Sequence, residues 1–112
     1  MECLHEDTDG VRVIRLTGRM DIEGNDEIAL RFNTLTVTGG QSIIIDLTGV
    51  EFLGSIGIGT LVTGAKTVKL RHGMLVLCGA RANVLSALQR TNIPEFIPTY
   101  GTLDEARVHV TG

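Results

Sequence analysis

The sequence predicts a single small α/β domain built on a mixed sheet. Its 112 residues are the size of one compact domain. Short, nearly continuous apolar runs, typical of strands buried on both faces, alternate along the chain with segments of helical apolar spacing. An Asp-Gly pair near the N-terminus predicts an antiparallel hairpin, and a strand–helix–strand order predicts parallel pairing. We therefore expect about four or five strands and about four helices, in one domain over residues 1–112.

The N-terminal third begins with the hairpin and continues into a helix. Residues 2–7 and 11–17 are rich in β-forming side chains and flank Asp9-Gly10, so we expect them to pair. Apolar residues then follow a helical stripe over 25–37. We expect Gly24 or Asn25 to open this helix and Gly39-Gly40 to end it.

The rest of the chain alternates strands and helices. We expect strands at 42–47 and 74–78, helices at 55–71 and 83–90, and a short edge strand at 95–97 between two prolines. Thr102 and Glu105 form a capping box that opens a terminal helix. In the helix at 55–71, the stripe that faces the core consists of Ile58, Leu61, Val62, Ala65 and Val68.

Composition excludes several classes of protein. Ten basic residues against 13 acidic ones give a net charge of −3, and the basic residues are scattered. Together with few aromatic residues, this argues against nucleic-acid binding. No apolar run approaches the roughly 18 residues of a membrane span. With no signal peptide and two distant cysteines, we expect a cytoplasmic protein with no cofactor and no metal site, in which Cys78 is a core residue.

The segment 50–61 is the most informative part of the chain. It connects the carboxyl end of an expected buried strand to the start of a helix, the edge at which α/β sheets usually bind ligands and partners. Gly54 and Gly57 flank Ser55 and remove side chains there. Because glycine weakens a helix interior, we interpret these positions as room for another protein to approach.

Ser55 has two interpretations at this helix start. Its hydroxyl can cap the helix by accepting from the N–H of Gly57 or Ile58. Alternatively, it can carry a phosphoryl group, since helix N-termini stabilise anions. That group would add roughly −1.5 to −2 charges to an apolar surface containing Phe52, Leu53 and Ile56, and so repel a partner that packs there.

In these features the chain resembles the STAS domain, and most closely the bacterial anti-sigma factor antagonists. The resemblance covers nearly the whole chain and rests on the order of several motifs. After the hairpin come GRMD at 18–21, IIIDL at 43–47, VEFL at 50–53, SIGIG at 55–59 and TLDEA at 102–106.

The resemblance implies a partner-switching protein without enzymatic activity. In that family the unphosphorylated antagonist binds a GHKL-type serine kinase that is the anti-sigma factor, and a metal-dependent serine phosphatase reverses the modification. By this resemblance Ser55 is the phosphorylation site, Gly57 matches the glycine of the Asp-Ser-Ser-Gly-like motif, and Asp21 matches the acidic residue beside it. The family's acidic residue and second serine are Gly54 and Ile56 here. We expect the partner-binding residues to be Asp21, Gly54, Ser55, Ile56, Gly57 and Ile58.

Other functions fit the residues less well. Gly59 to Thr67 is one residue out of register with the phosphate-binding pattern G-x-x-x-x-G-K-S/T, and its apolar residues fit a helix better. A serine hydrolase would place glycine two residues before Ser55, and the three histidines are expected to be surface residues. A non-phosphorylated STAS scaffold, such as a subunit of a stress-signalling complex or a lipid-transport accessory, stays open. Asp46 and Asp21 each stay open between capping a local turn or helix and serving the site.

Overall fold

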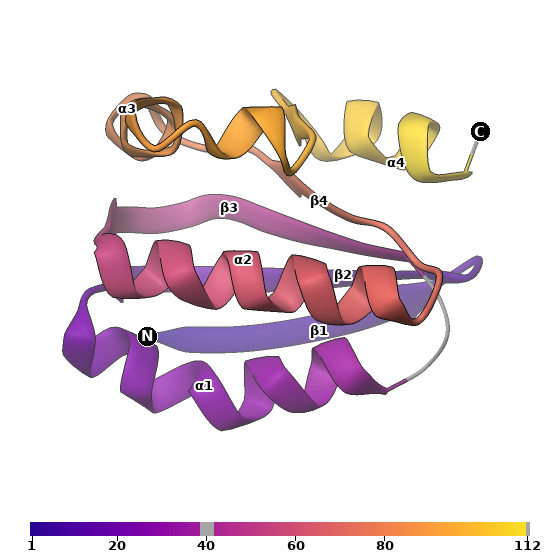
Figure 1. Ribbon diagram of the computed structural model, residues 1–112, viewed down its shortest axis with the longest axis horizontal. Coiled ribbons are helices and arrows are strands. Elements are labelled where there is room, and N and C mark those ends of the chain that lie inside the picture. The colour runs from indigo at the N-terminus through magenta and orange to yellow at the C-terminus, as the bar shows by residue number, and fades with distance from the viewer. Residues whose placement is uncertain (39–41, 112) are drawn as a thin grey trace.

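The computed structural model describes residues 1–38 and 42–111 and shows a five-stranded mixed sheet in the order β1-β2-β3-β4-β5 (Figure 1). The strands are Glu2–Thr8 (β1), Val11–Met20 (β2), Ser42–Leu53 (β3), Leu75–Cys78 (β4) and Thr99–Tyr100 (β5). The helices are Ile22–Val37 (α1), Ser55–Leu70 (α2), Ala82–Arg90 (α3) and Leu103–Thr111 (α4), with a 3-10 helix at Ile93–Glu95 (η1). The predicted fold class is therefore confirmed.

The N-terminal hairpin forms as expected. β1 pairs antiparallel with β2 from Glu2 opposite Thr17 to Thr8 opposite Val11. Asp9 and Gly10 both have positive φ, 52° and 78°, which is the backbone that a two-residue hairpin turn requires. β1 is an edge of the sheet, and all its side chains except Cys3 and Thr8 are exposed.

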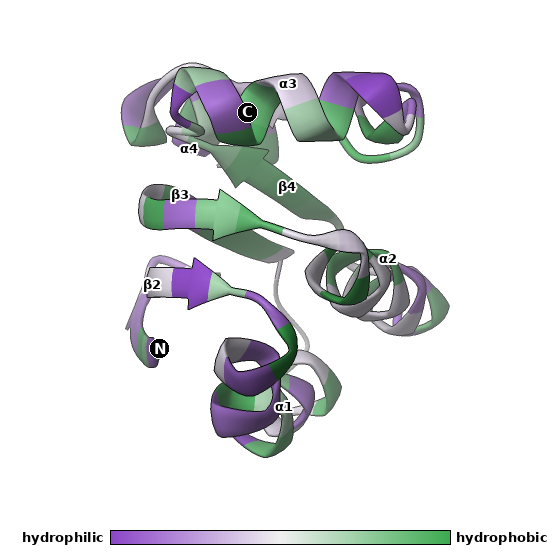
Figure 2. Cartoon of the chain, turned by 90° about the vertical axis from the view of Figure 1, so that its left-hand side faces the viewer, coloured by the Kyte–Doolittle hydropathy of each residue, from purple (hydrophilic) through white to green (hydrophobic). Residues whose placement is uncertain are grey.

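The remaining strands are parallel and carry the core on both faces. β2 pairs with β3, β3 with β4, and β4 with β5. Alternate residues of β3 point to opposite faces: Ile43, Ile45 and Leu47 share a core with side chains of α1, α2 and α3, whereas Ile44 belongs to a second core beneath α4. Figure 2 shows α1 and α2 on the same side of the strands.

Four boundaries differ from the sequence predictions. β2 continues three residues past its expected end at residue 17, to Met20. α1 begins at Ile22, three residues earlier than expected, because Asp21 is its N-cap. β3 continues past Leu47 to Leu53, and the expected edge strand at 95–97 is wrong. There the chain forms η1, and the edge strand is β5. The expected helix stop at Gly39-Gly40 lies outside the described residues.

The other elements begin and end within about two residues of their expected positions. In α2, the expected inward stripe is confirmed: Leu61 and Val68 are buried, and Ile58, Val62 and Ala65 pack against the core. At α4, the Glu105 N–H donates to Thr102 Oγ1 at 3.2 Å, so Thr102 caps that helix as predicted.

Candidate functional site

Two helix N-termini lie next to each other at one edge of the sheet. β2 and β3 are parallel neighbours, and their last residues, Met20 and Leu53, are in register. The residues that follow, Asp21 and Gly54, are the N-caps of α1 and α2. The Gly54 N–H donates to the Met20 carbonyl at 3.1 Å, which fixes one helix start beside the other. Figure 2 looks onto this edge, where both strands end and both helices begin.

Ser55 is the first residue of α2, and its side chain is exposed. The expected capping role of its hydroxyl is wrong, because the N-cap is Gly54, which has no side chain to bond with. Within residues 1–38 and 42–111, the Ser55 hydroxyl makes no hydrogen bond. It therefore faces solvent at the positive end of the helix dipole, where a negatively charged group is stabilised.

Asp21 stabilises the neighbouring helix start. Its Oδ1 accepts from the Gly24 N–H at 2.8 Å, and its Oδ2 lies 3.5 Å from Arg19 Nε. The Gly24 hydrogen bond and the Arg19 side chain hold the pKa of this carboxyl below its ordinary value. The interpretation of Asp21 as a helix cap is confirmed, while its contact with a partner stays a prediction.

Three exposed apolar side chains lie at or next to the two adjacent helix starts. Ile22, the first residue of α1, is 70% exposed, Ile56 is 48% exposed and Phe52 is 38% exposed. The Arg19 guanidinium lies over the Phe52 ring, 4.6 Å from its centre. We call the surface formed by these groups the helix-start surface; it consists of Arg19, Asp21, Ile22, Phe52, Gly54, Ser55 and Ile56.

Ile22 and Arg19 were not predicted as site residues from the sequence. Recognising Asp21 as the N-cap would have placed Ile22 in the first turn of the helix, beside the expected site. Arg19 carried no such signal, since its role depends on the pairing of β2 with β3, which places it beside Phe52.

Two of the six expected partner-binding residues face inward instead. Gly57 is buried, and a Cβ added to it would lie 2.6 Å from Met20 Cγ and 2.9 Å from Leu53 Cδ1. The absence of a side chain there makes room for the protein's own Met20 rather than for a partner, so that interpretation of Gly57 is wrong. Ile58 is half-buried and packs against the core. Gly59, in contrast, is exposed with open space around it.

A polar contact joins α1 to α2 just below this surface. Thr60 Oγ1 donates to Asn25 Oδ1 at 2.6 Å, and Asn25 is buried. A buried amide is costly without a partner, and this bond ties the first turn of α1 to the second turn of α2. The relative position of Ser55 and Asp21 is thus held by a main-chain bond and a side-chain bond.

Asp46, Cys78 and the three histidines do not belong to this surface. Asp46 lies inside β3 rather than at a strand end, and its Oδ1 accepts from the Thr48 N–H and hydroxyl at 3.0 and 2.6 Å. It therefore serves a local turn of the strand. His5, His72 and His109 are exposed, as predicted. Cys78 is buried, and burial raises the pKa of its thiol to about 12, which confirms it as a core residue.

The part of the chain that the structure describes has neither a cluster of metal ligands nor a membrane-spanning helix. Within residues 1–38 and 42–111, no three His, Cys, Asp or Glu side chains gather as metal ligands. None of the helices in that part of the chain has both the length and the apolar content needed to cross a bilayer.

The whole arrangement matches one protein family. The model of the STAS domain matches residues 4–106. This chain belongs to the STAS domain family. The match includes both helix starts and the sheet edge between them, so the expected family is confirmed.

Several similar proteins are anti-sigma factor antagonists. A STAS domain protein of Planctomyces limnophilus, described as an anti-sigma factor antagonist, is 30% identical, with 98% of each chain covered and a TM-score of 0.88. An anti-sigma F factor antagonist of Paenibacillus polymyxa is 22% identical over 92 residues, which cover 81% of this chain and 79% of the relative. The phosphorylated form of SpoIIAA, a cell fate determinant of Bacillus, is 22% identical and shares the fold, with a TM-score of 0.71 over 97% of this chain and 99% of that one.

Proposed function

We propose that this STAS domain is a cytoplasmic, non-enzymatic anti-sigma factor antagonist that binds its partner through the helix-start surface. The partner is an anti-sigma factor that is also a GHKL-type serine kinase, and it binds the unphosphorylated chain. The antagonist relatives support the role. The exposed Ser55 hydroxyl among exposed apolar side chains, without an internal hydrogen bond, is the observation that carries the proposal.

Phosphorylation of Ser55 is the proposed release signal. The kinase transfers the γ-phosphoryl group of ATP to Ser55 Oγ, which loses its proton, and ADP leaves; a metal-dependent phosphatase hydrolyses the ester to serine and phosphate. The orphan N–H groups of the α2 start stabilise the added charge, so the fold is retained. A partner packed on Ile22, Phe52 and Ile56 would have to desolvate that charge, and binding is lost.

Mass spectrometry tests the modification directly. The chain is incubated with the candidate kinase and ATP, and its intact mass is measured. We expect the mass of one phosphoryl group to be gained, and this gain to be absent in Ser55→Ala. Ser86→Ala is the matched control, because Ser86 is an exposed serine of α3 away from the helix-start surface. A gain that persists in Ser55→Ala contradicts the assignment.

Calorimetric binding to the kinase tests the charge mechanism. We expect Ser55→Ala to bind like the natural chain and Ser55→Asp to bind about tenfold more weakly, as a charge facing an apolar partner surface costs of the order of 1.4 kcal/mol or more. Equal affinity of the two variants would refute release by charge.

A second candidate, a docking module that is not phosphorylated, is favoured by one observation. Gly54 replaces the acidic residue that the family has before the phosphorylated serine, and Ile56, 48% exposed, replaces the second serine. These changes make the turn more apolar and less like a kinase substrate. No gain of phosphate together with retained partner binding would support this alternative, and Ile56→Ser would then weaken binding.

A further inference from the structure

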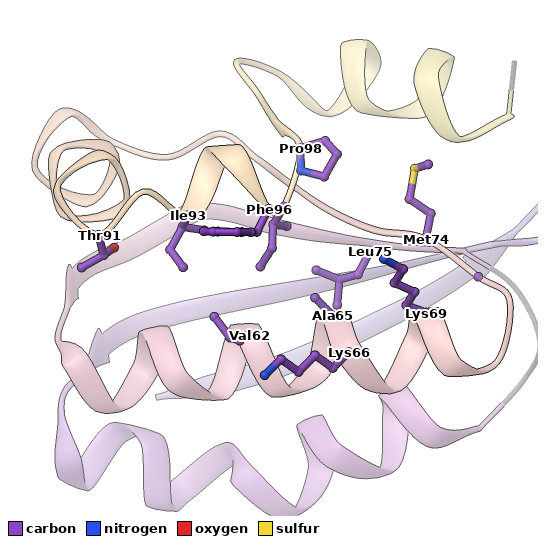
Figure 3. Close-up of a pocket in the computed structure, with 12 residues that line it drawn as sticks. Val62, Ala65, Lys66, Lys69, Met74, Leu75, Thr91, Ile93, Phe96 and Pro98 are labelled. Atoms are coloured by element: carbon purple, nitrogen blue, oxygen red, sulfur yellow. The ribbon is translucent and has the colours of Figure 1, made fainter.

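The structure contains a groove that is separate from the helix-start surface. It lies between the C-terminal half of α2 and the segment that follows α3, and its volume is about 690 Å³. Figure 3 shows Val62, Ala65 and Lys66 of α2 on one side of the groove, and Ile93, Phe96 and Pro98 on the other. Cavities that bind small organic molecules in proteins are usually about 300–1,000 Å³, so this groove is large enough for one.

The walls of the groove are mostly apolar. Leu75, Ile93 and Ile97 are buried and form its base, whereas Met74 and Phe96 lie at its margin and are 46% and 77% exposed. A phenyl ring with so much exposed surface is costly in water and gains from being covered by an apolar chain. The groove therefore favours an aliphatic ligand.

Two lysines give one part of the groove a positive charge. Lys66 and Lys69 both line it and, being three residues apart on α2, lie on the same side of the helix. Within the described residues, neither lysine has a carboxylate partner, although the whole chain carries a net charge of −3. Glu95, the acidic residue of η1, does not line the groove. The positive charge of Lys66 and Lys69 thus makes this part of the groove complementary to an anion.

Polar groups elsewhere in the groove are already satisfied. Thr91, at the end away from Lys69 in Figure 3, donates its hydroxyl to the Ala87 carbonyl at 2.9 Å. The lysines are therefore the place where a charged head group would bind, with the apolar walls left for a tail. The groove volume of about 690 Å³ lies within the range of small-molecule sites, and the apolar walls beside two lysines suit one molecule with a charged head and an apolar tail.

We infer that this groove binds a small amphipathic anion, an aliphatic carboxylate whose head group contacts Lys66 and Lys69 and whose chain lies against Phe96 and the base of the groove. Binding there leaves Ser55 at the opposite end of α2 untouched. The inference is independent of the proposed switch, and either can fail alone.

Decanoate, below its micelle concentration, is the probe. Titration into the isotope-labelled chain, followed by amide NMR shifts, is expected to move the signals of groove residues and leave those around Ser55 in place. Decan-1-ol lacks the charge and acetate lacks the chain. We expect the alcohol to bind more weakly than decanoate and acetate not to bind.

Two variants measure separately what the charged head group and the aliphatic chain of the ligand contribute to binding. The double variant Lys66→Gln/Lys69→Gln should weaken decanoate binding about threefold to tenfold, which is the range expected for the loss of two exposed charge pairs. The affinity for decan-1-ol should not change. Phe96→Ala, at an exposed position that the fold tolerates, should weaken both ligands. Arg90→Gln removes one positive charge from an exposed residue outside the groove and is the control for net charge.

Several outcomes would overturn the inference. Absence of groove shifts with decanoate, or an equal loss of affinity in Arg90→Gln and the lysine variant, excludes a specific anion site. If the amide NMR signals of the same residues shift with protein concentration alone, and sedimentation shows a dimer, the groove is occupied by a second copy of the chain. Shifts caused by the anti-sigma factor but not by decanoate assign it to a protein partner.

Discussion

Two glycines in the same helix should respond in opposite ways to the same substitution. In Gly57→Ala, the new Cβ would lie 2.6 Å from Met20 Cγ and 2.9 Å from Leu53 Cδ1, whereas apolar carbon atoms prefer about 3.5–4.0 Å. Met20 is fully buried, so it must shift within a packed core. In Gly59→Ala, the Cβ would have nothing within 4 Å.

The expected magnitudes follow from packing and helix propensity. Overpacking costs about 1–3 kcal/mol, and replacing glycine by alanine inside a helix gains about 1 kcal/mol. We therefore expect Gly57→Ala to lose about 0–2 kcal/mol of unfolding free energy and Gly59→Ala to gain about 1 kcal/mol. For a domain of this size, the gain raises Tm by about 4 °C.

Urea and thermal unfolding followed by far-ultraviolet circular dichroism measure both variants, since the chain has no Trp. A double variant, Met20→Ala with Gly57→Ala, removes the side chain that the new Cβ meets. Its loss should be smaller than the sum of the single losses by about 1 kcal/mol. Equal stabilisation by the two glycine substitutions, or strict additivity in the double variant, would refute the argument that Gly57 accommodates Met20.

Three further predictions concern the site and the cysteines. In Gly24→Ala, the new Cβ would collide with the Arg19 carbonyl, and urea unfolding should show a loss of more than about 2 kcal/mol. Because folding lowers the pKa of Asp21 from its ordinary value, its charged form stabilises the fold at neutral pH, and this contribution disappears as pH falls through the lowered pKa. Asp21→Asn should therefore have a lower Tm than the natural chain at neutral pH and a similar Tm in strong acid. Cys3 and Cys78 are buried, and burial raises the pKa of both thiols, that of Cys78 to about 12. We expect mass spectrometry to find neither cysteine alkylated by iodoacetamide in the folded chain at neutral pH, and both alkylated in urea. Alkylation of the folded chain would contradict this prediction.

Much of the fold could be predicted because its signals are local. The Asp9-Gly10 turn, the apolar stripe of α2 and the apolar run at 43–45 each depend on residues that are close in sequence. Ser55 was placed correctly at a helix start for the same reason. These signals specify which segments form helices and strands, and hence that α2 follows a buried parallel strand.

The errors arise where distant residues decide the structure. β3 was expected to end before Thr48 and Gly49, which are typical of turns, but its pairing with β2 continues through two register shifts and carries it to Leu53. Gly24 resembled a helix boundary, although it lies inside α1 because only a glycine fits against the Arg19 carbonyl. The inward role of Gly57 depends on Met20 in another strand, a contact that no local pattern reveals.

The outer strand of the hairpin has a consequence for how the molecule behaves at high concentration. β1 has a strand partner on one side only, and such a rim can recruit a strand from a neighbouring molecule, although the Cys3 carbonyl already accepts from Arg31 Nε at 2.6 Å. Here the rim carries charged side chains, some of them paired within the hairpin: Arg12 binds Asp7 at 2.8 Å, and Arg15 lies 3.4 Å from Glu6. A neighbouring strand would have to desolvate these groups in order to pair with β1. Charged side chains along this strand thus oppose fibrillar stacking and favour separate molecules.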